Sequence, residues 1–229
     1  MFRKLHAILS EWKRQKSFAL NSLDLKLKPY LDFKRGFFVE AGANDGIRQS
    51  NTLYFERYMG WRGLLIEPIP ELAAECKANR PNAIVENCAL VSFDYPKDYV
   101  EMQYCNLMSI VKGGLGGSDA ESAHIEKGKR FLREGEEVYN VSAPARTLSD
   151  ILDKRGITKV DLLSLDVEGY EQEALKGIDF SRHRPRFMLI EVRDYPAIEK
   201  IIEPWYQPTA ILTINPAYQD ILYKARDER

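Results

Sequence analysis

The sequence has 229 residues, of which 45% are hydrophobic and 29% are charged, a composition typical of a globular domain with a substantial core. Its formal net charge of −1 gives no bulk electrostatic reason to expect a nucleic-acid partner. No run approaches the ~18 consecutive apolar residues that a membrane-spanning helix needs, so no transmembrane segment is predicted.

The first 35 residues are basic, with nine Lys and Arg against three Asp and Glu, a net charge of +6. Their apolar residues recur at helical spacing, at Phe2, Leu5, Ile8, Leu9 and Trp12. We predict that residues 1–35 form a basic amphipathic helical segment. It packs on the domain that follows, residues 36–229, or joins two copies of the chain as a homo-oligomer. A helix lying on a membrane surface is the alternative.

Short apolar strands alternate with helical segments from Gly36 onward. The predicted strands in this part are 37–41, 64–67 and 83–87, and the predicted helices are 52–59 and 70–79. Pro70 suits the first turn of its helix, where a missing N–H leaves no bond unmade. The alternation is typical of parallel βαβ units with right-handed crossovers.

This rhythm breaks over residues 93–140. Residues 99–105 alternate between polar and apolar side chains, which suits a half-exposed strand. A glycine-rich loop over 112–118 and a charged run over 119–137 follow. We predict that 93–140 leaves the main sheet and forms a lid over a substrate site. A mobile surface loop without a role is the alternative.

Regular elements return after residue 146. Thr147 and Asp150 predict a helix N-terminus, and Gly156 ends that helix after Arg155. The remaining predicted elements are strands 160–165 and 187–192, helices 170–176 and 197–203, and a strand pair at 210–214 and 221–224. The pattern predicts an α/β domain with a mostly parallel sheet.

Two of the predicted strands end in an acid beside a glycine turn. Glu40 precedes the turn and Glu67 ends the next strand. The turn contains Gly42, Asn44, Asp45 and Gly46. Glycines let the backbone approach a ligand, and an acid on the neighbouring strand binds the ribose hydroxyls of a nucleoside cofactor. The turn lacks the GxGxxG pattern, and Asp45 would repel a pyrophosphate, so the sequence favours the cationic S-adenosylmethionine over NAD.

Asp166 and Glu191 lie at or near the ends of two further strands, so four acids meet at the carboxyl edge of the sheet, where α/β proteins bind ligands. Asp166 and Glu168 are two residues apart and lie on one side of an extended chain. Such a pair can orient hydroxyls or divide acid and base work, and a Glu168 that only caps the next helix is the alternative. The pair also leaves a Mg²⁺ or Ca²⁺ site open, but nothing further indicates a metal.

Histidine and cysteine carry little of the predicted chemistry. The histidines are His6, His124 and His183, so a carboxylate is the better base, with His124 in the predicted lid as the alternative. The cysteines Cys76, Cys88 and Cys105 are odd in number and lack CxxC spacing, so neither a zinc site nor a disulfide framework is predicted. Unpaired thiols favour a reducing, cytoplasmic location. The sequence contains no GxSxG motif, so nothing in it indicates a hydrolase.

Several motifs occur in a set order between residues 36 and 192. They are Phe38–Gly46 (FVEAGANDG), Ser50–Thr52 (SNT), Leu65–Pro68 (LIEP), Asn87–Leu90 (NCAL), Pro144–Leu148 (PARTL) and Leu165–Glu171 (LDVEGYE). Together they resemble the FkbM family of S-adenosylmethionine-dependent methyltransferases. The resemblance implies a class I methyltransferase fold, which is Rossmann-like, with a mostly parallel seven-stranded sheet, an antiparallel last strand and helices on both faces.

The resemblance also implies cofactor contacts for residues in the matching motifs. Glu40 and Gly42 would contact the methionine end of the cofactor, and Asn44, Asp45 and Gly46 would line the turn beneath it. Asn51 and Thr52 would lie near the cofactor carboxylate. Glu67, followed by Pro68, would bind the ribose hydroxyls, and Cys88 and Ala89 would flank the adenine. Asp166 and Glu168 would lie on the methyl side of the cofactor, and on that placement we predict Asp166, and after it Glu168, as the general base.

The activity that the resemblance implies is methyl transfer to oxygen, commonly to a hydroxyl of a sugar or a glycosylated product. We therefore predict an O-methyltransferase acting on a small hydroxylated acceptor. One alternative keeps the cofactor and methylates a protein or a nucleic acid, for which the basic N-terminal segment is the best support. Another is a catalytically silent binding module with the same fold.

Overall fold

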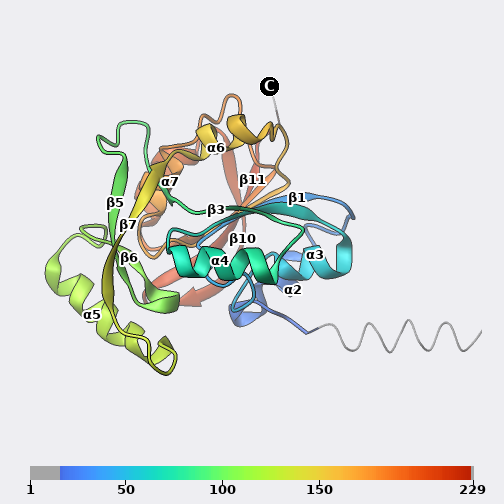
Figure 1. Ribbon diagram of the computed structural model, residues 1–229. Coiled ribbons are helices and arrows are strands. Elements are labelled where there is room, and N and C mark those ends of the chain that lie inside the picture. The colour runs from blue at the N-terminus through green and yellow to red at the C-terminus, as the bar shows by residue number, and fades with distance from the viewer. Residues whose placement is uncertain (1–15, 228–229) are drawn as a thin grey trace, which may run out of the picture.

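The computed structural model describes residues 16–227, and its centre is a seven-stranded sheet (Figure 1). The strands, in spatial order, are β10 (Tyr206–Asn215), β11 (Tyr218–Ala225), β9 (Phe187–Val192), β8 (Leu162–Leu165), β1 (Phe37–Ala41), β2 (Arg62–Ile66) and β3 (Ile84–Glu86). Strands β9, β8, β1, β2 and β3 pair in parallel, and β11 pairs antiparallel with both β9 and β10. The predicted sheet, with its last strand antiparallel, is confirmed.

Helices cover both faces of this sheet, which is also confirmed (Figure 1). One face packs against α2 (Leu23–Leu27), α3 (Leu53–Met59) and α4 (Pro70–Asn79). The other packs against α6 (Leu148–Arg155), α7 (Glu171–Leu175) and α8 (Tyr195–Ile202). Successive side chains of a strand point to opposite faces, so Phe38 of β1 joins the first core and Val39 the second. Because both faces are buried, the strands are continuous apolar runs.

Residues 16–35 pack on the first face through Leu23, Leu27 and Leu31, which contact the same core as Phe38 and Trp61. A short 3-10 turn, η1 (Leu20–Ser22), leads into α2. The apolar pattern at 2–12, on which the amphipathic helix and the homo-oligomer were predicted, lies outside the described residues. Within 16–227, no helix has the length and apolar character needed to cross a membrane.

The boundaries of several elements differ from those predicted. Helix α3 begins at Leu53 because Thr52 is its N-cap. Helix α8 begins at Tyr195, two residues before the predicted start, because the Asp194 side chain accepts the Ala197 N–H and caps the helix there. The C-terminal hairpin is longer than predicted at both strands, since its ladder continues to Tyr206 and Ala225.

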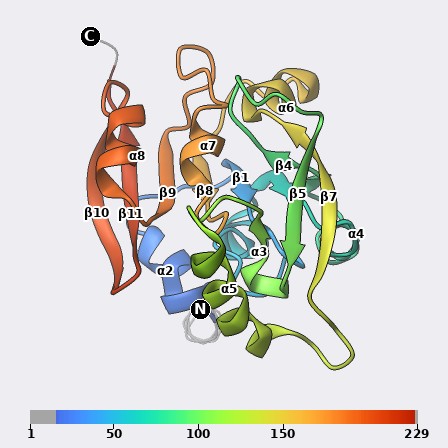
Figure 2. The same cartoon turned by 90° about the vertical axis from the view of Figure 1, so that its left-hand side faces the viewer.

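The largest departure is a second, four-stranded sheet beside the first (Figure 2). Its order is β4 (Ala89–Leu90), β7 (Tyr139–Arg146), β5 (Tyr99–Tyr104) and β6 (Ile110–Val111). The turn η2 (Asn106–Met108), helix α5 (Ser118–Gly128) and the turn η3 (Lys129–Phe131) connect these strands. The half-exposed strand predicted at 99–105 is β5, but β7, α5 and the sheet itself were not predicted. Their pairing joins residues that are far apart in sequence, which local patterning does not reveal.

Candidate active site

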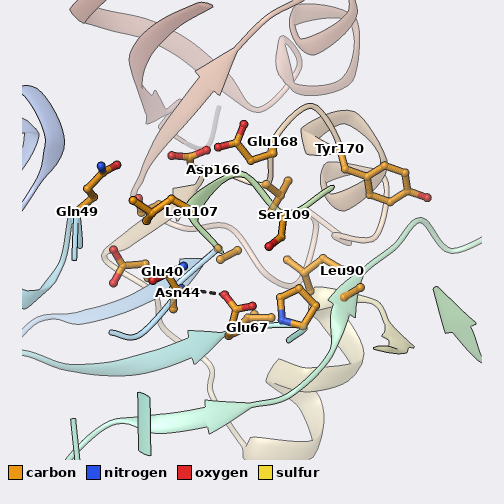
Figure 3. Close-up of a pocket in the computed structure, with 18 of the residues that line it drawn as sticks. Glu40, Asn44, Gln49, Glu67, Leu90, Leu107, Ser109, Asp166, Glu168 and Tyr170 are labelled. Carbon is orange, nitrogen blue, oxygen red and sulfur yellow. Dashed lines mark hydrogen bonds between the residues drawn. The ribbon is translucent and has the colours of Figure 1, made fainter. Parts of the chain in front are cut away.

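A cavity lies at the carboxyl ends of β1, β2 and β8, and the second sheet closes its other side (Figure 3). The cavity brings together ten of the predicted site residues: Glu40, Gly42, Asn44, Asn51, Glu67, Pro68, Cys88, Ala89, Asp166 and Glu168. They come from strand ends and turns that are more than a hundred residues apart in sequence. The parallel order of the sheet places these segments at one edge, as the four strand-end acids predicted.

Asp45, Gly46 and Thr52 are predicted site residues that lie behind the cavity wall rather than in it. Asp45 Oδ1 accepts the Ile47 and Arg48 N–H groups, both at 2.8 Å, and so folds the turn. Gly46 lies against the α4 side of the turn, and Thr52 is fully buried. These residues shape the loop from beneath.

Gly42 is required where the exits of β1 and β8 pass each other. Its φ is 83°, in the left-handed region, and a Cβ added there would lie 1.8 Å from the Asp166 carbonyl oxygen. The absence of a side chain thus lets the two chain segments approach, which brings Asp166 beside the glycine turn.

Glu40 is buried, and its carboxylate holds the loop that follows β1. Its oxygens accept hydrogen bonds from the Ser50 hydroxyl at 2.8 Å, the Asn51 N–H at 2.7 Å and the Thr52 hydroxyl at 2.6 Å. The fully buried Arg80 lies 3.5 Å away as counter-ion. Protein donors already hydrogen-bond to both oxygens of the Glu40 carboxylate. Its main role at the cavity is therefore to position the loop over residues 50–52.

Glu67 follows β2 and fixes the opposite side of the turn. Its Oε2 accepts the Asn44 N–H at 2.8 Å, drawn in Figure 3, and its Oε1 accepts the Ile69 N–H at 2.9 Å. Burial raises the pKa of this carboxyl to about 8, against the lowering effect of the two backbone hydrogen bonds. Hydroxyl groups of a ligand in the cavity would stabilise this buried carboxyl by hydrogen-bonding to it.

An acidic cluster lies on the far side of the cavity, where Asp166 and Glu168 lie next to each other (Figure 3). Asp166 Oδ1 is buried and has no hydrogen-bond partner within residues 16–227. Burial raises the pKa of Asp166, and burial together with the charge of Asp166 raises that of Glu168 to about 8. Behind them, Glu191 near the end of β9 forms an ion pair with Arg193 at 2.6 Å. These raised pKa values are typical of functional carboxyls.

The cluster also offers a geometric test of the metal site that the sequence left open. Oxygens of Asp166, Glu171 and Glu191 lie within 4.8 Å of one another. Glu171 already accepts the Val167 and Gly169 N–H groups, and Arg193 supplies the positive charge that a cation would bring. Glu171 and Glu191 are therefore committed to protein partners, which leaves Asp166 alone of the three, within residues 16–227, with a free oxygen, and we assign no metal ligands.

Residues that sequence reasoning missed form the roof of the cavity and its supports. The roof is contributed by η2, β6 and the β8–α7 turn, through Asn106, Leu107, Ser109, Val111 and Tyr170. Arg80 and Arg193 support the acids from behind. The predicted lid over 93–140 was the available signal for the roof. No signal in the sequence marks which arginines fold inward, because that depends on distant partners.

Comparison with known proteins identifies the family of this chain. A family model described as the methyltransferase FkbM domain matches residues 40–219. The chain belongs to this family. None of the curated proteins matches the FkbM domain described here.

The chain also has a distant similarity to solved methyltransferases, at low sequence identity. An FkbM methyltransferase from Methylobacillus flagellatus KT has a TM-score of 0.49 and 15% identity, over 89% of this chain and 53% of that one. This FkbM domain thus spans about half of that chain. A TehB-like SAM-dependent methyltransferase from Corynebacterium glutamicum has a TM-score of 0.46 and 10% identity, over 96% and 97%.

A third solved structure contains bound ligands. It is 1,6-didemethyltoxoflavin-N1-methyltransferase from Burkholderia thailandensis, with bound 1,6-didemethyltoxoflavin and S-adenosylhomocysteine. Its TM-score is 0.45 and its identity 11%, over 97% of this chain and 84% of that one.

Proposed function

We propose that the chain is an S-adenosylmethionine-dependent methyltransferase that methylates a hydroxyl of a small, sugar-like acceptor. The observation that carries the proposal is the placement of Glu67 and Asp166 in one cavity. One is a buried carboxyl beside the glycine turn, and the other is a carboxylate with a buried oxygen that lacks a hydrogen-bond partner within the described residues. Family membership over 40–219 supports the reaction class.

The residues at the carboxyl ends of β1 and β2 fit a nucleoside cofactor. Glu67 is suited to accept hydrogen bonds from ribose hydroxyls, and Cys88 and Ala89 form a wall of small side chains for a flat base. The backbone at Gly42 and Asn44 lines the cavity between these two groups of residues. When bound, S-adenosylmethionine supplies an electrophilic methyl group and a positive charge, which suits a cavity whose nearby acids outnumber its bases.

Asp166 is the group that we assign to take the proton of the acceptor hydroxyl. An alcohol is a weak nucleophile until its proton is removed, and a carboxylate with a raised pKa is a better base than one in water. The roof contains the polar side chains of Ser109 and Asn106. A roofed cavity with these groups supports a small polar acceptor over a macromolecule.

Calorimetric titration of the full chain with S-adenosylmethionine, and separately with NAD, tests the cofactor. We expect binding of S-adenosylmethionine alone, weakened at least tenfold by Glu67→Ala. The control is Glu86→Ala, because Glu86 ends the neighbouring strand β3 but pairs with Arg155 outside the cavity. Absence of S-adenosylmethionine binding to the wild-type protein would overturn the proposal.

Mass spectrometry of acceptor mixtures tests the methyl acceptor. We expect a gain of one methyl group on hydroxylated small molecules, and none with Asp166→Asn, which should still bind the cofactor. Methylation of protein or nucleic acid instead, lost when residues 1–35 are deleted, would favour the alternative acceptors. Full turnover by Asp166→Asn would remove the assigned role of Asp166.

A further inference from the structure

One basic side chain lines the cavity, that of Arg48, and no other lysine or arginine of residues 16–227 does so. The acids that line the same space are Glu40, Glu67, Asp166 and Glu168. Arg48 is exposed, and its side chain forms no ion pair or hydrogen bond with the described residues. The mouth of an acidic cavity thus holds one cation that is free to pair with a ligand.

The backbone around Arg48 is fixed from several sides. The Arg48 N–H donates to Asp45 Oδ1 at 2.8 Å, and the next residue, Gln49, forms a parallel bridge with Ala19. Beyond them, Glu40 holds the loop over residues 50–52. Four of the seven non-glycine residues with positive φ in the described part of the chain line this cavity, namely Asn44, Gln49, Asn106 and Glu168. Unusual backbone that the surroundings maintain at a cavity points to a functional constraint on these loops.

The position of Gln49 indicates which part of a bound cofactor Arg48 would meet. Figure 3 shows Gln49 and Leu90 on opposite sides of the cavity, with Glu67 between them. In the proposed function, the base lies against residues 88–89, directly before Leu90, and the ribose lies at Glu67. The base and the methionine chain of S-adenosylmethionine leave the ribose on opposite sides. The methionine chain therefore extends toward Gln49 and Arg48.

The residues that the family resemblance places near the cofactor carboxylate supply no positive charge. The Thr52 hydroxyl donates to Glu40 at 2.6 Å behind the cavity wall. The Asn51 amide nitrogen donates to Ser164 Oγ at 3.0 Å, and the Asn51 amide oxygen is an acceptor, which cannot hydrogen-bond to a carboxylate. In a cavity lined by acids, a ligand carboxylate is repelled unless a cation offsets it. Arg48 is placed to supply that cation.

We propose that Arg48 binds the carboxylate of the methionine chain of S-adenosylmethionine. A guanidinium offers parallel N–H donors that match the two oxygens of a carboxylate. The acids then face the positive sulfonium while Arg48 pairs with the negative end, so the charges set the direction in which the cofactor lies. The contact presupposes the proposed methyltransferase function, because it needs bound S-adenosylmethionine. It makes Arg48 a specificity residue that distinguishes this cofactor from nucleosides without a carboxylate.

Calorimetric titration of the full chain with two ligands tests the contact. The ligands are S-adenosylmethionine and its decarboxylated form, which differ only in the carboxylate. Arg48→Gln removes the charge and keeps the backbone N–H that Asp45 accepts. We expect this variant to bind S-adenosylmethionine about tenfold more weakly than the wild type, the effect of losing one charge-assisted pair. Its affinity for the decarboxylated ligand should stay within about twofold, because that ligand has no group to pair with Arg48.

Two further variants separate the contact from a general effect of charge. Arg48→Lys keeps the charge without the two parallel donors, so it should recover part of the affinity for S-adenosylmethionine. Arg62→Gln is the matched control, because Arg62 is equally exposed but lies at the start of β2, outside the cavity. It should bind both ligands as the wild type does. Unfolding in urea should be the same for Arg48→Gln and the wild type, since the side chain is exposed.

The outcomes distinguish this contact from the function on which it depends. If Arg48→Gln binds S-adenosylmethionine as tightly as the wild type, or loses affinity equally for both ligands, Arg48 does not bind the carboxylate and the proposal is overturned. In either case the proposed function stands, because the wild-type protein binds the cofactor. If the wild-type protein binds neither ligand, the proposed function itself fails and the contact fails with it.

Discussion

Most of the buried acids around the cavity hydrogen-bond to protein groups that the loops position. Arg80 is fully buried and contacts Glu40 and Glu56 at 3.5 and 2.7 Å, and so neutralises acids that would otherwise destabilise the core. Asp166 is the exception, since its Oδ1 has no hydrogen-bond partner within residues 16–227. An unmatched buried oxygen is costly for stability, and its presence is explained by the chemistry that we assign to it.

Gly42→Ala should be among the most damaging single-methyl additions to this chain. The new Cβ would lie 1.8 Å from the Asp166 carbonyl oxygen, and the φ of 83° disfavours any side chain. We expect a loss of about 3 kcal/mol in the free energy of unfolding, measured in urea, because backbone must move on both sides. The same change should abolish cofactor binding.

Gly60→Ala is the matched control for this substitution. Gly60 ends α3 with a φ of 68°, but no heavy atom of the described residues lies within 4 Å of an added Cβ. Only the conformational cost applies, about 1 kcal/mol. Equal losses for the two variants would show that crowding at Gly42 is unimportant.

The strand-end acids could be predicted from sequence because their positions follow from local patterns. An apolar run that ends in Glu40 or Glu67 predicts a buried strand and places the acid at its carboxyl end. The partners of these acids could not be predicted in the same way. Arg80 reaches Glu40 across 40 residues of sequence, and His124 reaches Glu168 across 44, contacts that depend on the tertiary fold.

Among the elements, the second sheet determines how the cavity is closed. Arg133, after η3, donates to Glu75 of α4 at 2.7 Å and to Asp45 of the glycine turn at 3.2 Å. Glu136 accepts the Arg133 N–H and the Asn106 side-chain amide, at 2.7 and 2.9 Å. Arg133 and Glu136 thereby connect Asn106 of the roof to α4 and to the glycine turn.

Arg133→Met should loosen this connection without unfolding the domain. The arginine side chain is 36% exposed, so the ion pairs contribute at most about 1 kcal/mol to stability. Hydrogen exchange should instead accelerate across 106–138, and cofactor affinity should fall. Arg146→Met is the control, because Arg146 at the end of β7 pairs with Asp150 of α6, outside the roof. Unchanged exchange in Arg133→Met would show that the roof is held by its apolar contacts alone.

Elements were predictable where their sequence spacing was local and regular. The strands before and after the predicted lid are short apolar runs, and the helices there have polar and apolar residues at helical spacing. The structure confirms these elements, with shifts of a few residues at their ends. In the second sheet, β7 contains Pro144 and pairs with β5 some forty residues earlier, so neither its composition nor its neighbours indicated a strand.

At the scale of the whole molecule, the buried acids make stability depend on pH in an unusual direction. Burial raises the pKa values of Glu67 and Glu168 to about 8 and of Glu171 to about 7. In the unfolded chain, glutamate titrates near pH ~4.3. Between these values the folded protein binds more protons than the unfolded chain, so the free energy of unfolding falls as pH rises through this range.

Urea unfolding of the ligand-free protein at about pH 6 and about pH 8 measures this dependence. We expect lower stability at the higher pH, with each retained proton contributing up to about 1.4 kcal/mol per pH unit. Glu67→Gln removes one of these protons and should reduce the slope, whereas Glu86→Gln, outside the cavity, should leave it unchanged. A cationic cofactor favours the ionised acids, so saturating S-adenosylmethionine should flatten the slope further. Stability that stays level from pH ~6 to ~8 would show that these acids are already ionised in the free protein.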